Sequence, residues 1–227
     1  MYNILVTGSN GQLGSELQVL AKQYQQYRFF FTDVAELDIT HKTAIKVFVK
    51  ENSINAIINC AAYTAVDKAE SEEIIADKIN HVAVKNLAEV AKATNCKLIH
   101  ISTDYVFDGT NHLPYVETDV PNPQSVYGAT KLAGEQALQT INPSNSIIIR
   151  TSWVYSSYGA NFVKTMLKLG KERSELNVIF DQIGTPTYAR DLAKTILEIL
   201  PKIKNKEVTV FHYTNEHLAE HLRKNSY

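Results

Sequence analysis

The feature that most restricts the fold is a glycine-rich turn between an apolar strand and a helix. Tyr2–Val6 is an apolar run without polar alternation, which is typical of a strand buried on both faces of a parallel sheet. Gly8, Gly11 and Gly14 follow in the pattern GxxGxxG and lead into a predicted helix over Ser15–Tyr24. The first glycine permits a tight turn, the second lets backbone N–H groups approach a pyrophosphate, and the third lets helix and strand pack closely. The motif therefore predicts a dinucleotide site at the N-terminus of this helix.

A carboxylate follows the second predicted strand, as a ribose-binding group would. The strand Tyr27–Thr32 ends at Asp33, where a carboxylate can accept a hydrogen bond from a ribose hydroxyl. Asp33 favours NADH because it repels a 2′-phosphate, but the sequence leaves both NADH and NADPH open. Asp38 and Ile39 can flank the adenine, although Asp38 suits a simple turn cap equally well.

Strands and helices alternate up to about residue 150, which predicts a Rossmann-type α/β fold with a doubly wound parallel sheet. We expect residues 1–150 to form the dinucleotide-binding domain. Residues 151–227 are expected to form a small, incomplete substrate-side lobe, some of whose elements pack back on the first domain. The expected strands are Tyr2–Val6, Tyr27–Thr32, Ala56–Cys60, Lys97–Ser102, Ser146–Arg150, Asn177–Phe180 and Val208–His212; the expected helices are Ser15–Tyr24, a helix capped by Thr40 that ends at Glu51, Ala76–Thr94, Val126–Thr140, Asn161–Gly170 and Ala189–Leu200.

Tyr127 and Lys131 form a YxxxK pair within a predicted helix. Side chains four positions apart share a helix face and can reach one point. A free phenol has a pKa of about 10, and a neighbouring ammonium lowers it towards neutrality. Taken alone, such a pair more often lies on a solvated helix face, but this one follows a strand that ends in Thr103, at the sheet edge where ligands bind. The pattern predicts that Thr103 orients a carbonyl, Tyr127 donates a proton and Lys131 tunes Tyr127 and holds the nicotinamide ribose.

Charge and cysteine content exclude several other classes. The formal net charge is −1, which gives no electrostatic reason to expect nucleic acid or an anionic membrane as a partner. Cys60 and Cys96 lack a metal-binding or redox spacing, and we expect two reduced, buried thiols. The N-terminus has no signal-peptide pattern and no apolar run is long enough to span a bilayer. These features predict a cytoplasmic, soluble protein.

Six segments occur in an order that is more specific than either short motif alone: GSNGQLG, NCAAYTAVDKAE, STDYVFDG, YGATKLAGE, RTSWVY and DQIGTPT. Over about residues 3 to 215 the chain resembles the dTDP-4-dehydrorhamnose reductases, a family of extended short-chain dehydrogenases/reductases. The resemblance implies that hydride from NAD(P)H reaches the C4 ketone of dTDP-4-dehydro-β-L-rhamnose while Tyr127 protonates the alkoxide, giving dTDP-L-rhamnose.

The resemblance also assigns contacts to residues of this chain. Trp153, the single tryptophan, suits a core position better than a ligand contact when it is considered without the family. The implied cofactor contacts are Gly8, Asn10, Gly11, Gln12, Leu13, Gly14, Asp33, Asp38, Ile39, Ala61, Ala62, Thr64, Tyr127 and Lys131, and the implied substrate contacts are Val66, Thr103, Asp104, Tyr105, Tyr127 and Trp153.

Two features depart from the family pattern. Some members hold magnesium between subunits of a dimer through glutamates; Glu16 matches one position, but Tyr188–Asp191 does not match the other. We therefore expect no metal site, although magnesium and a homodimer both stay open, and we expect Glu16 on the surface. Members usually continue for several dozen residues after FHYTNE, whereas Asn215–Tyr227 does not resemble that continuation. A truncation or frameshift is the preferred explanation, with weakened substrate binding as its expected consequence.

Two alternative functions stay open. One is a nucleotide-sugar epimerase or dehydratase of the same superfamily, which would retain its NAD; STDYVF and RTSWVY argue against it by resemblance. The other is a non-catalytic dinucleotide-binding regulatory protein. The complete set of Thr103, Tyr127 and Lys131 argues against this second alternative.

Overall fold

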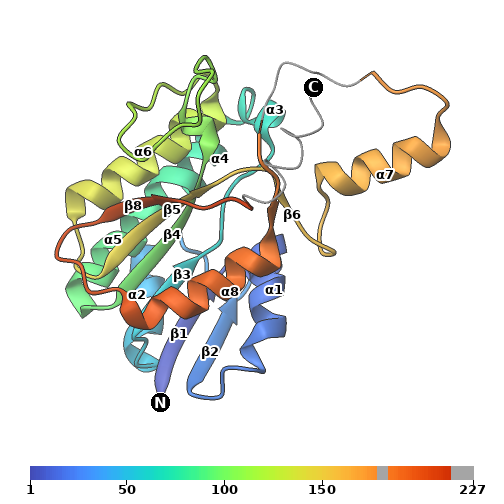
Figure 1. Cartoon of the computed structure of the whole chain (residues 1–227). Helices are drawn as coiled ribbons and strands as arrows, with labels where there is room; N and C mark the ends of the chain where they lie inside the picture. The colour runs from blue at the N-terminus through green and yellow to red at the C-terminus, as the bar shows by residue number, and fades with distance from the viewer. Residues whose placement is uncertain (178–183, 216–227) are drawn as a thin grey trace.

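A computed structural model describes residues 1–177 and 184–215, and its centre is a six-stranded parallel sheet. The strand order is β2-β1-β3-β4-β5-β8, so the chain starts inside the sheet at β1, adds β2 on one side and then adds the other strands on the opposite side (Figure 1). This arrangement confirms the predicted Rossmann-type fold. The strands are β1 (Tyr2–Thr7), β2 (Tyr27–Thr32), β3 (Ala56–Asn59), β4 (Lys97–Thr103), β5 (Ser146–Thr151) and β8 (Thr209–His212).

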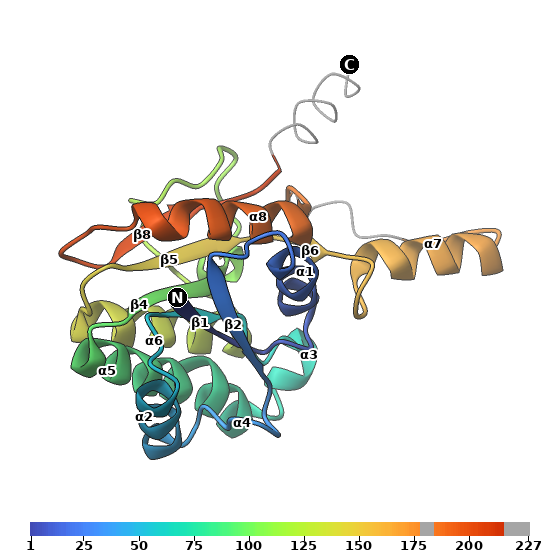
Figure 2. The same cartoon turned by 90° about the horizontal axis from the view of Figure 1, so that it is seen from below.

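Helices cover both faces of the sheet, as a doubly wound fold requires. Helices α1 and α8 lie on one face, and α2, α4, α5 and α6 lie on the other (Figure 2). The helices are α1 (Gln12–Ala21), α2 (Lys42–Glu51), α3 (Val66–Ala69), α4 (Glu73–Asp77), α5 (Ala83–Thr94), α6 (Val126–Ile141), α7 (Phe162–Glu172) and α8 (Ala189–Ile199), with a π-helical turn at Lys78–Val82 and 3₁₀ turns at Asp104–Val106 and Leu200–Lys202.

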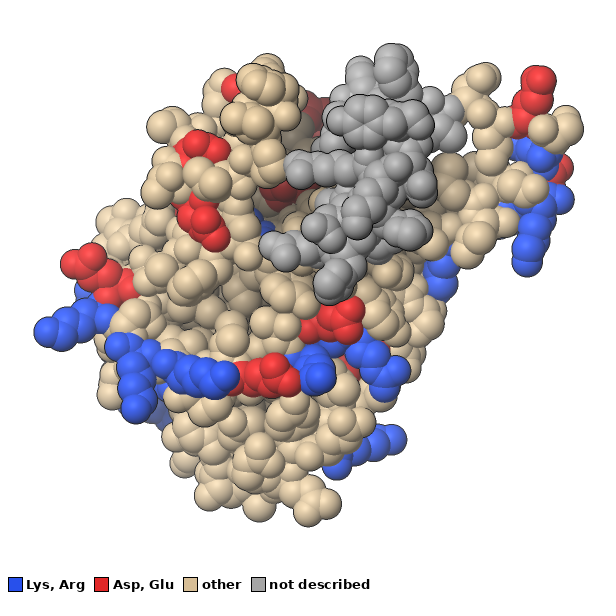
Figure 3. Space-filling view, in the orientation of Figure 1, with Lys and Arg blue, Asp and Glu red and all other residues tan. Residues whose placement is uncertain are grey.

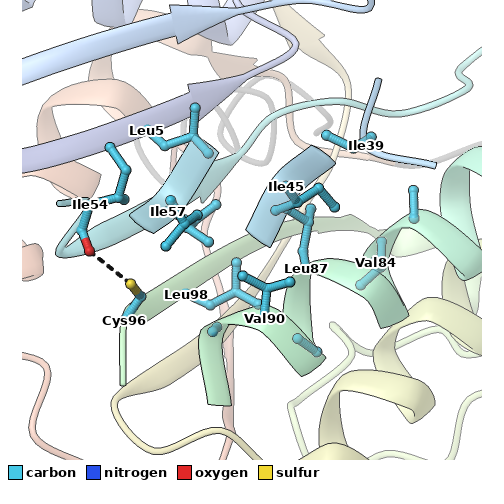
Figure 4. Close-up of a cluster of buried hydrophobic side chains, with 14 of the residues drawn as sticks. Leu5, Ile39, Ile45, Ile54, Ile57, Val84, Leu87, Val90, Cys96 and Leu98 are labelled. Atoms are coloured by element: carbon cyan, nitrogen blue, oxygen red, sulfur yellow. Dashed lines mark hydrogen bonds between the residues drawn. The ribbon is translucent and has the colours of Figure 1, made fainter. Parts of the chain in front are cut away.

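Alternate residues of the central strands enter two separate cores. Leu5, Ile57 and Leu98 face Ile45 and Leu87 of the helices on one side (Figure 4). The intervening strand residues enter the core beneath α1 and α8. Each fully buried side chain of this size contributes about 1.5–3 kcal/mol of transfer free energy, so apolar strands without alternation are what this sheet requires. The residues of the second core include Ile4, Val6, Ile58, Ile99 and Ile149.

Several predicted boundaries differ from the structure. Helix α1 begins at Gln12, three positions before the predicted start, because Gly11 already serves as its N-cap. Thr40 was predicted to cap α2, but the N-cap is His41, while the N–H of Thr40 donates to Asp38 Oδ1 (2.8 Å). Helix formation around the predicted Ala76–Thr94 starts earlier, at α4, and passes through the π-helical turn. The predicted strand Asn177–Phe180 lies, except for Asn177, outside the described residues.

The segments beyond residue 150 divide between the sheet and a separate extension. Strand β8 pairs with β5, and α8 packs against α1, so both elements return to the Rossmann sheet. Strands β6 (Val154–Tyr155) and β7 (Thr187–Tyr188) form a small parallel pair, and α7 projects away from the body (Figure 1). A domain division at residue 150 stays a prediction.

The surface agrees with the balanced composition. Lys and Arg side chains alternate with Asp and Glu over the face seen in Figure 3, without a broad field of one sign. Cys96 is buried and Cys60 is half-buried rather than buried as expected; both are free thiols. Within the described ranges, no helix is long and apolar enough to cross a bilayer.

Candidate active site

In the glycine-rich turn, backbone atoms occupy the space that side chains would otherwise fill. Gly8 has a φ of +65°, and a Cβ there would lie 2.6 Å from the Cα of Ala61. A Cβ on Gly14 would lie 2.5 Å from the carbonyl oxygen of Gly8, and the N–H of Gly11 donates to that same oxygen (3.1 Å). Contacts below 3.0 Å to backbone atoms admit no side chain, so glycine is required at Gly8 and Gly14 for the turn to close.

The start of α1 is left open towards this turn. Within the described chain no side chain caps α1, because its N-cap residue is Gly11. The N–H groups of the first helical turn therefore remain suited to a phosphate, with the positive end of the helix dipole behind them. Leu13 contributes only backbone here, since its side chain is 7% exposed and belongs to the core. These features fit the diphosphate of a dinucleotide.

Asp33 holds the turn from the neighbouring strand. Its Oδ2 accepts from the N–H of Asn10 (3.1 Å) and its Oδ1 accepts from the N–H of Val34 (2.8 Å). The N–H of Ser9 donates to the carbonyl of Thr32 (3.1 Å). The carboxylate is half-buried at the end of β2, where the sequence predicted a ribose-binding group.

The remaining predicted adenosine-side residues follow β2. Asp38 accepts a hydrogen bond from the N–H of Thr40, and its Oδ2 lies 3.3 Å from Nε2 of His41, which is the capping role that the sequence also allowed. Ile39 is 7% exposed and its side chain packs into the core of Figure 4. Only the backbone of Ile39 is thus available to a ligand.

The predicted cofactor path, Ala61, Ala62 and Thr64, is positioned by the π-helical turn. Asn80 in that turn accepts from the N–H of Tyr63 (2.9 Å) and donates to its carbonyl (3.1 Å). Asn80 is 1% exposed, so it fixes the segment from inside the protein. The extra residue of a π-helical turn aims a side chain in a direction that a regular helix does not provide, and such turns are frequent at functional sites.

Helix α6 brings Tyr127 and Lys131 to the edge of β4. Ser125 caps the helix by accepting from the N–H of Gly128 (3.1 Å). A Cβ on Gly128 would lie 2.2 Å from the carbonyl oxygen of Tyr105, so glycine allows the helix to touch the end of β4 directly. Tyr127 and Lys131 are both buried, which excludes the alternative of a solvated helix face.

The pKa of the Tyr127 phenol is governed mainly by the burial of its side chain. Burial raises its pKa to about 12, and nearby Asp104 and Tyr105 act in the same direction, while hydrogen bonding with Thr103 opposes them. The sequence predicted a lowered pKa through Lys131, and this prediction is wrong for the structure. The reason is that burial of the phenol outweighs the other influences, and that Lys131 is held elsewhere.

Lys131 is 2% exposed and donates through Nζ to the carbonyl of Ile101 (2.7 Å). Burial lowers its pKa to about 8, and Glu135 acts in the opposite direction. Glu135 itself forms a buried ion pair with Arg150, with Oε2 to Nη2 at 2.7 Å and both carboxylate oxygens 3.1 Å from Nε. An ammonium with a pKa of about 8 is charged at neutral pH and can exchange its proton near that range.

Thr103, the last residue of β4, and Asp104, the first residue of the following 3₁₀ turn, lie beside Tyr127. The Thr103 hydroxyl donates to Asp104 Oδ1 (3.0 Å) and accepts from the N–H of Tyr105 (3.2 Å). Burial raises the pKa of Asp104, against the effect of its hydrogen bond with Thr103. The ring of Tyr105 meets that of Tyr127 edge-on, with centroids 5.4 Å apart. The structure thus brings these four side chains together.

A cavity of about 830 Å³ opens next to this group. Four of the predicted residues line it, namely Thr64, Val66, Tyr105 and Trp153. Val66 also packs in the small cluster that contains Tyr127, which links the cavity wall to the phenol. Trp153 adopts a left-handed backbone conformation (φ +47°) at the start of β6 and lies edge-on to another aromatic ring of the cavity, Phe162, at 5.2 Å.

The far wall of the cavity was not predicted from the sequence. Helix α7 was predicted, but its apolar side chains were not connected with the site. The pattern of apolar residues after Asn161 is the signal that could have found them, since it gives one helix face without a partner in the Rossmann core. The missed lining residues include Tyr155, Phe162, Val163, Met166, Leu167 and Pro186.

Glu16 was expected on the surface, and the structure corrects this expectation. Its side chain is 2% exposed and accepts from the hydroxyl of Ser156 (2.6 Å). Arg190 lies 4.0 Å from its other carboxylate oxygen. The burial arises because the segment after β6 folds over α1. Among the described residues no cluster of three or more His, Cys, Asp or Glu side chains is arranged to hold a metal ion.

A doubly wound parallel sheet, a glycine-rich turn at the start of α1 and a Tyr–Lys pair on α6 define a Rossmann-fold oxidoreductase of the short-chain dehydrogenase/reductase class. Residues 2–223 match the family described as the RmlD substrate binding domain. The chain belongs to the dTDP-4-dehydrorhamnose reductase family.

Individual relatives show how far the likeness extends. The chain is 45% identical over 219 residues to a dTDP-4-dehydrorhamnose reductase of Aggregatibacter actinomycetemcomitans, covering 95% of this chain and 74% of that one. A crystal structure of the reductase from Clostridium acetobutylicum superposes with a TM-score of 0.86 at 47% identity, over 93% of this chain and 74% of that one. The reductase from Bacillus anthracis, solved in complex with NADP, gives 0.88 at 42% identity over 95% and 75%. The chain thus spans about three quarters of these relatives.

Proposed function

We propose that this protein reduces the C4 ketone of dTDP-4-dehydro-β-L-rhamnose to dTDP-L-rhamnose with NADPH or NADH. The observation that carries the proposal is the buried Tyr127 beside Thr103, next to a cavity whose aromatic lining begins at Tyr105. The relatives with 42–47% identity named above carry the name of this reductase. This similarity favours a reductase over the epimerase, dehydratase and regulatory alternatives.

The dinucleotide would be held along the carboxyl edge of the sheet. Backbone N–H groups of the glycine-rich turn and of α1 would bind its diphosphate, and Asp33 would lie at the adenosine ribose. Ala61, Ala62 and Thr64 would line the path of the dinucleotide. When bound, the reduced nicotinamide supplies a hydride. Lys131 would approach the second ribose from the same helix as Tyr127.

Tyr127 then acts as the proton donor. A phenol with a pKa of about 12 stays protonated at neutral pH, and the alkoxide that forms on reduction of a ketone is a stronger base. Thr103 can turn its hydroxyl from Asp104 to the substrate oxygen, because the two acceptors compete for one proton. Lys131, with a pKa of about 8, stays largely charged at neutral pH, and its positive charge would favour the phenolate that Tyr127 becomes when it gives up its proton.

Two observations on the choice between NADH and NADPH point in opposite directions. Asp33 at the end of β2 disfavours a 2′-phosphate by charge repulsion, whereas the Bacillus anthracis relative holds NADP. Asn10 and Val34 already donate to the carboxylate, and these bonds weaken its repulsion. We therefore infer that the protein uses both NADPH and NADH. We also propose that it acts in the cytoplasm and that its partner molecule is a dTDP-sugar.

Dinucleotide oxidation in the presence of dTDP-4-dehydrorhamnose tests the proposal. NADPH and NADH are compared in parallel, and the sugar product is identified by NMR. The proposal expects dinucleotide oxidation that depends on the sugar and yields dTDP-L-rhamnose. Oxidation without a new sugar product, or a dinucleotide that stays bound through gel filtration and recycles, would contradict it and favour the epimerase or dehydratase alternative.

A further inference from the structure

The loop that carries α7 is bonded to the first turns of α1. Asn161 Nδ2 donates to Gln12 Oε1 (2.9 Å), and Gln12 Nε2 donates to the carbonyl of Val154 (3.2 Å). Ser156 adds its hydrogen bond to Glu16 one turn further along α1. Both ends of the Gln12 amide are therefore engaged by a segment more than 140 positions away in the sequence. We call the pair Gln12 and Asn161 the amide link.

Asn161 also determines where α7 begins. Its Oδ1 caps the helix by accepting from the N–H of Lys164 (3.0 Å), and its Nδ2 donates a second bond to the carbonyl of Ser156 (2.8 Å). One side chain thus fixes the helix start to the loop and to the dinucleotide-binding helix. N-capping by asparagine is among the strongest capping interactions.

Helix α7 depends on this anchor because it has little other support. None of its eleven described residues is buried. Phe162 is 47% exposed and Leu167 is 63% exposed, and both lie on the face that lines the 830 Å³ cavity with Val163 and Met166. A helix that is held mainly at one end moves with the group that holds it.

We propose that the amide link makes Asn161 a positioning residue that couples dinucleotide binding at the glycine-rich turn to binding of the nucleoside diphosphate sugar in the cavity beneath α7. A diphosphate bound at the N-terminus of α1 orders the first helical turn, which contains Gln12. Because Gln12 is hydrogen-bonded to Asn161 and Asn161 caps α7, an ordered Gln12 holds α7 and its cavity-lining side chains in one position. The inference rests on the proposed function, because it takes a dinucleotide and a nucleoside diphosphate sugar as the two ligands.

Linkage makes the coupling measurable from either side. If NADP⁺ tightens dTDP binding by a given factor, dTDP tightens NADP⁺ binding by the same factor. Couplings of this kind reach about fivefold or more. Trp153 lies in the cavity and is the single tryptophan, so its fluorescence reports dTDP binding without any turnover.

The test titrates dTDP with and without saturating NADP⁺ into the wild type and Asn161→Ser. Serine retains a capping oxygen, but it lacks the amide and is too short to reach Gln12. We expect a coupling of about fivefold in the wild type and about onefold in the variant, with NADP⁺ affinity alone unchanged. With NADPH saturating, KM for the sugar should rise while kcat stays the same. Lys171→Gln, at an exposed position of α7 that does not line the cavity, is the control and should retain wild-type coupling.

Gln12→Met is a second, independent variant that breaks the amide link, because methionine keeps the side-chain length but lacks the amide that bonds to Asn161 and Val154. Equal coupling in the wild type and in both variants would overturn the inference, as would the absence of coupling in a wild type that binds each ligand separately. A wild type that binds neither dTDP nor NADP⁺ would instead overturn the proposed function. Circular dichroism confirms that each variant is folded.

Discussion

Replacing Tyr127 with phenylalanine separates its proposed proton transfer from its packing. The side chain is 8% exposed and packs with Ala69, Ala76 and Val66, so phenylalanine fills the same space and leaves no cavity. The substitution removes only the hydroxyl, whose pKa burial raises to about 12. Loss of a positioned proton donor lowers turnover by about 10²- to 10⁴-fold, which corresponds to about 3–5.5 kcal/mol in the activation barrier.

The assay is steady-state NADPH oxidation with dTDP-4-dehydrorhamnose, run beside NADPH binding by fluorescence and thermal unfolding. We expect kcat to fall by at least about 10²-fold, with NADPH affinity and the unfolding temperature close to those of the wild type. Tyr63→Phe is the matched control, because it removes a hydroxyl from the edge of the same cluster, where Tyr63 donates to Glu72 (2.5 Å). Turnover in Tyr127→Phe above a tenth of the wild-type value would refute Tyr127 as the proton donor.

Three further predictions follow from the site. With the pKa of Lys131 lowered to about 8, its charged form is lost as the pH rises through that value, so kcat/KM should decline above about pH 8; a flat profile to pH 10 would exclude a role for its charge. Gly14→Ala places a Cβ 2.5 Å from backbone atoms, so it should destabilise the fold by about 1–3 kcal/mol and weaken NADPH binding. Gly170→Ala is the control, because its Cβ meets no atom within 4 Å; calorimetry should show unchanged stability and unchanged NADPH binding. Glu135→Gln leaves Arg150 as an unpaired buried charge and should cost about 3–5 kcal/mol in urea unfolding; a loss below about 1 kcal/mol would contradict the importance of the pair.

The parts of the fold that the sequence predicted well are those with a local cause. Apolar runs such as Tyr2–Val6 become buried strands, and the spacing of Gly8, Gly11 and Gly14 fits the turn that joins β1 to α1. Tyr127 and Lys131 share a face simply because they are four positions apart on α6. In each case the residues concerned are neighbours in the sequence.

The features that the sequence did not predict depend on residues far apart in the chain. Glu16 is buried because Ser156, 140 positions later, folds over it. The pKa of Tyr127 is raised because α6 packs closely against β4 and buries the phenol. The spacing of residues in the sequence does not indicate the depth of this burial. The wall that α7 adds to the cavity depends on the link between Asn161 and Gln12. Contacts between residues so far apart in the chain become visible only in the three-dimensional structure.

The most direct test of the proposed reduction follows the hydride itself. The protein is incubated with dTDP-4-dehydrorhamnose and NADPH that carries deuterium at both C4 positions of the nicotinamide, and the sugar is isolated and examined by NMR. The proposed function predicts dTDP-L-rhamnose with one deuterium at C4 of the sugar and NADP⁺ released into solution. A product without the label, or with the label at another carbon, would contradict it.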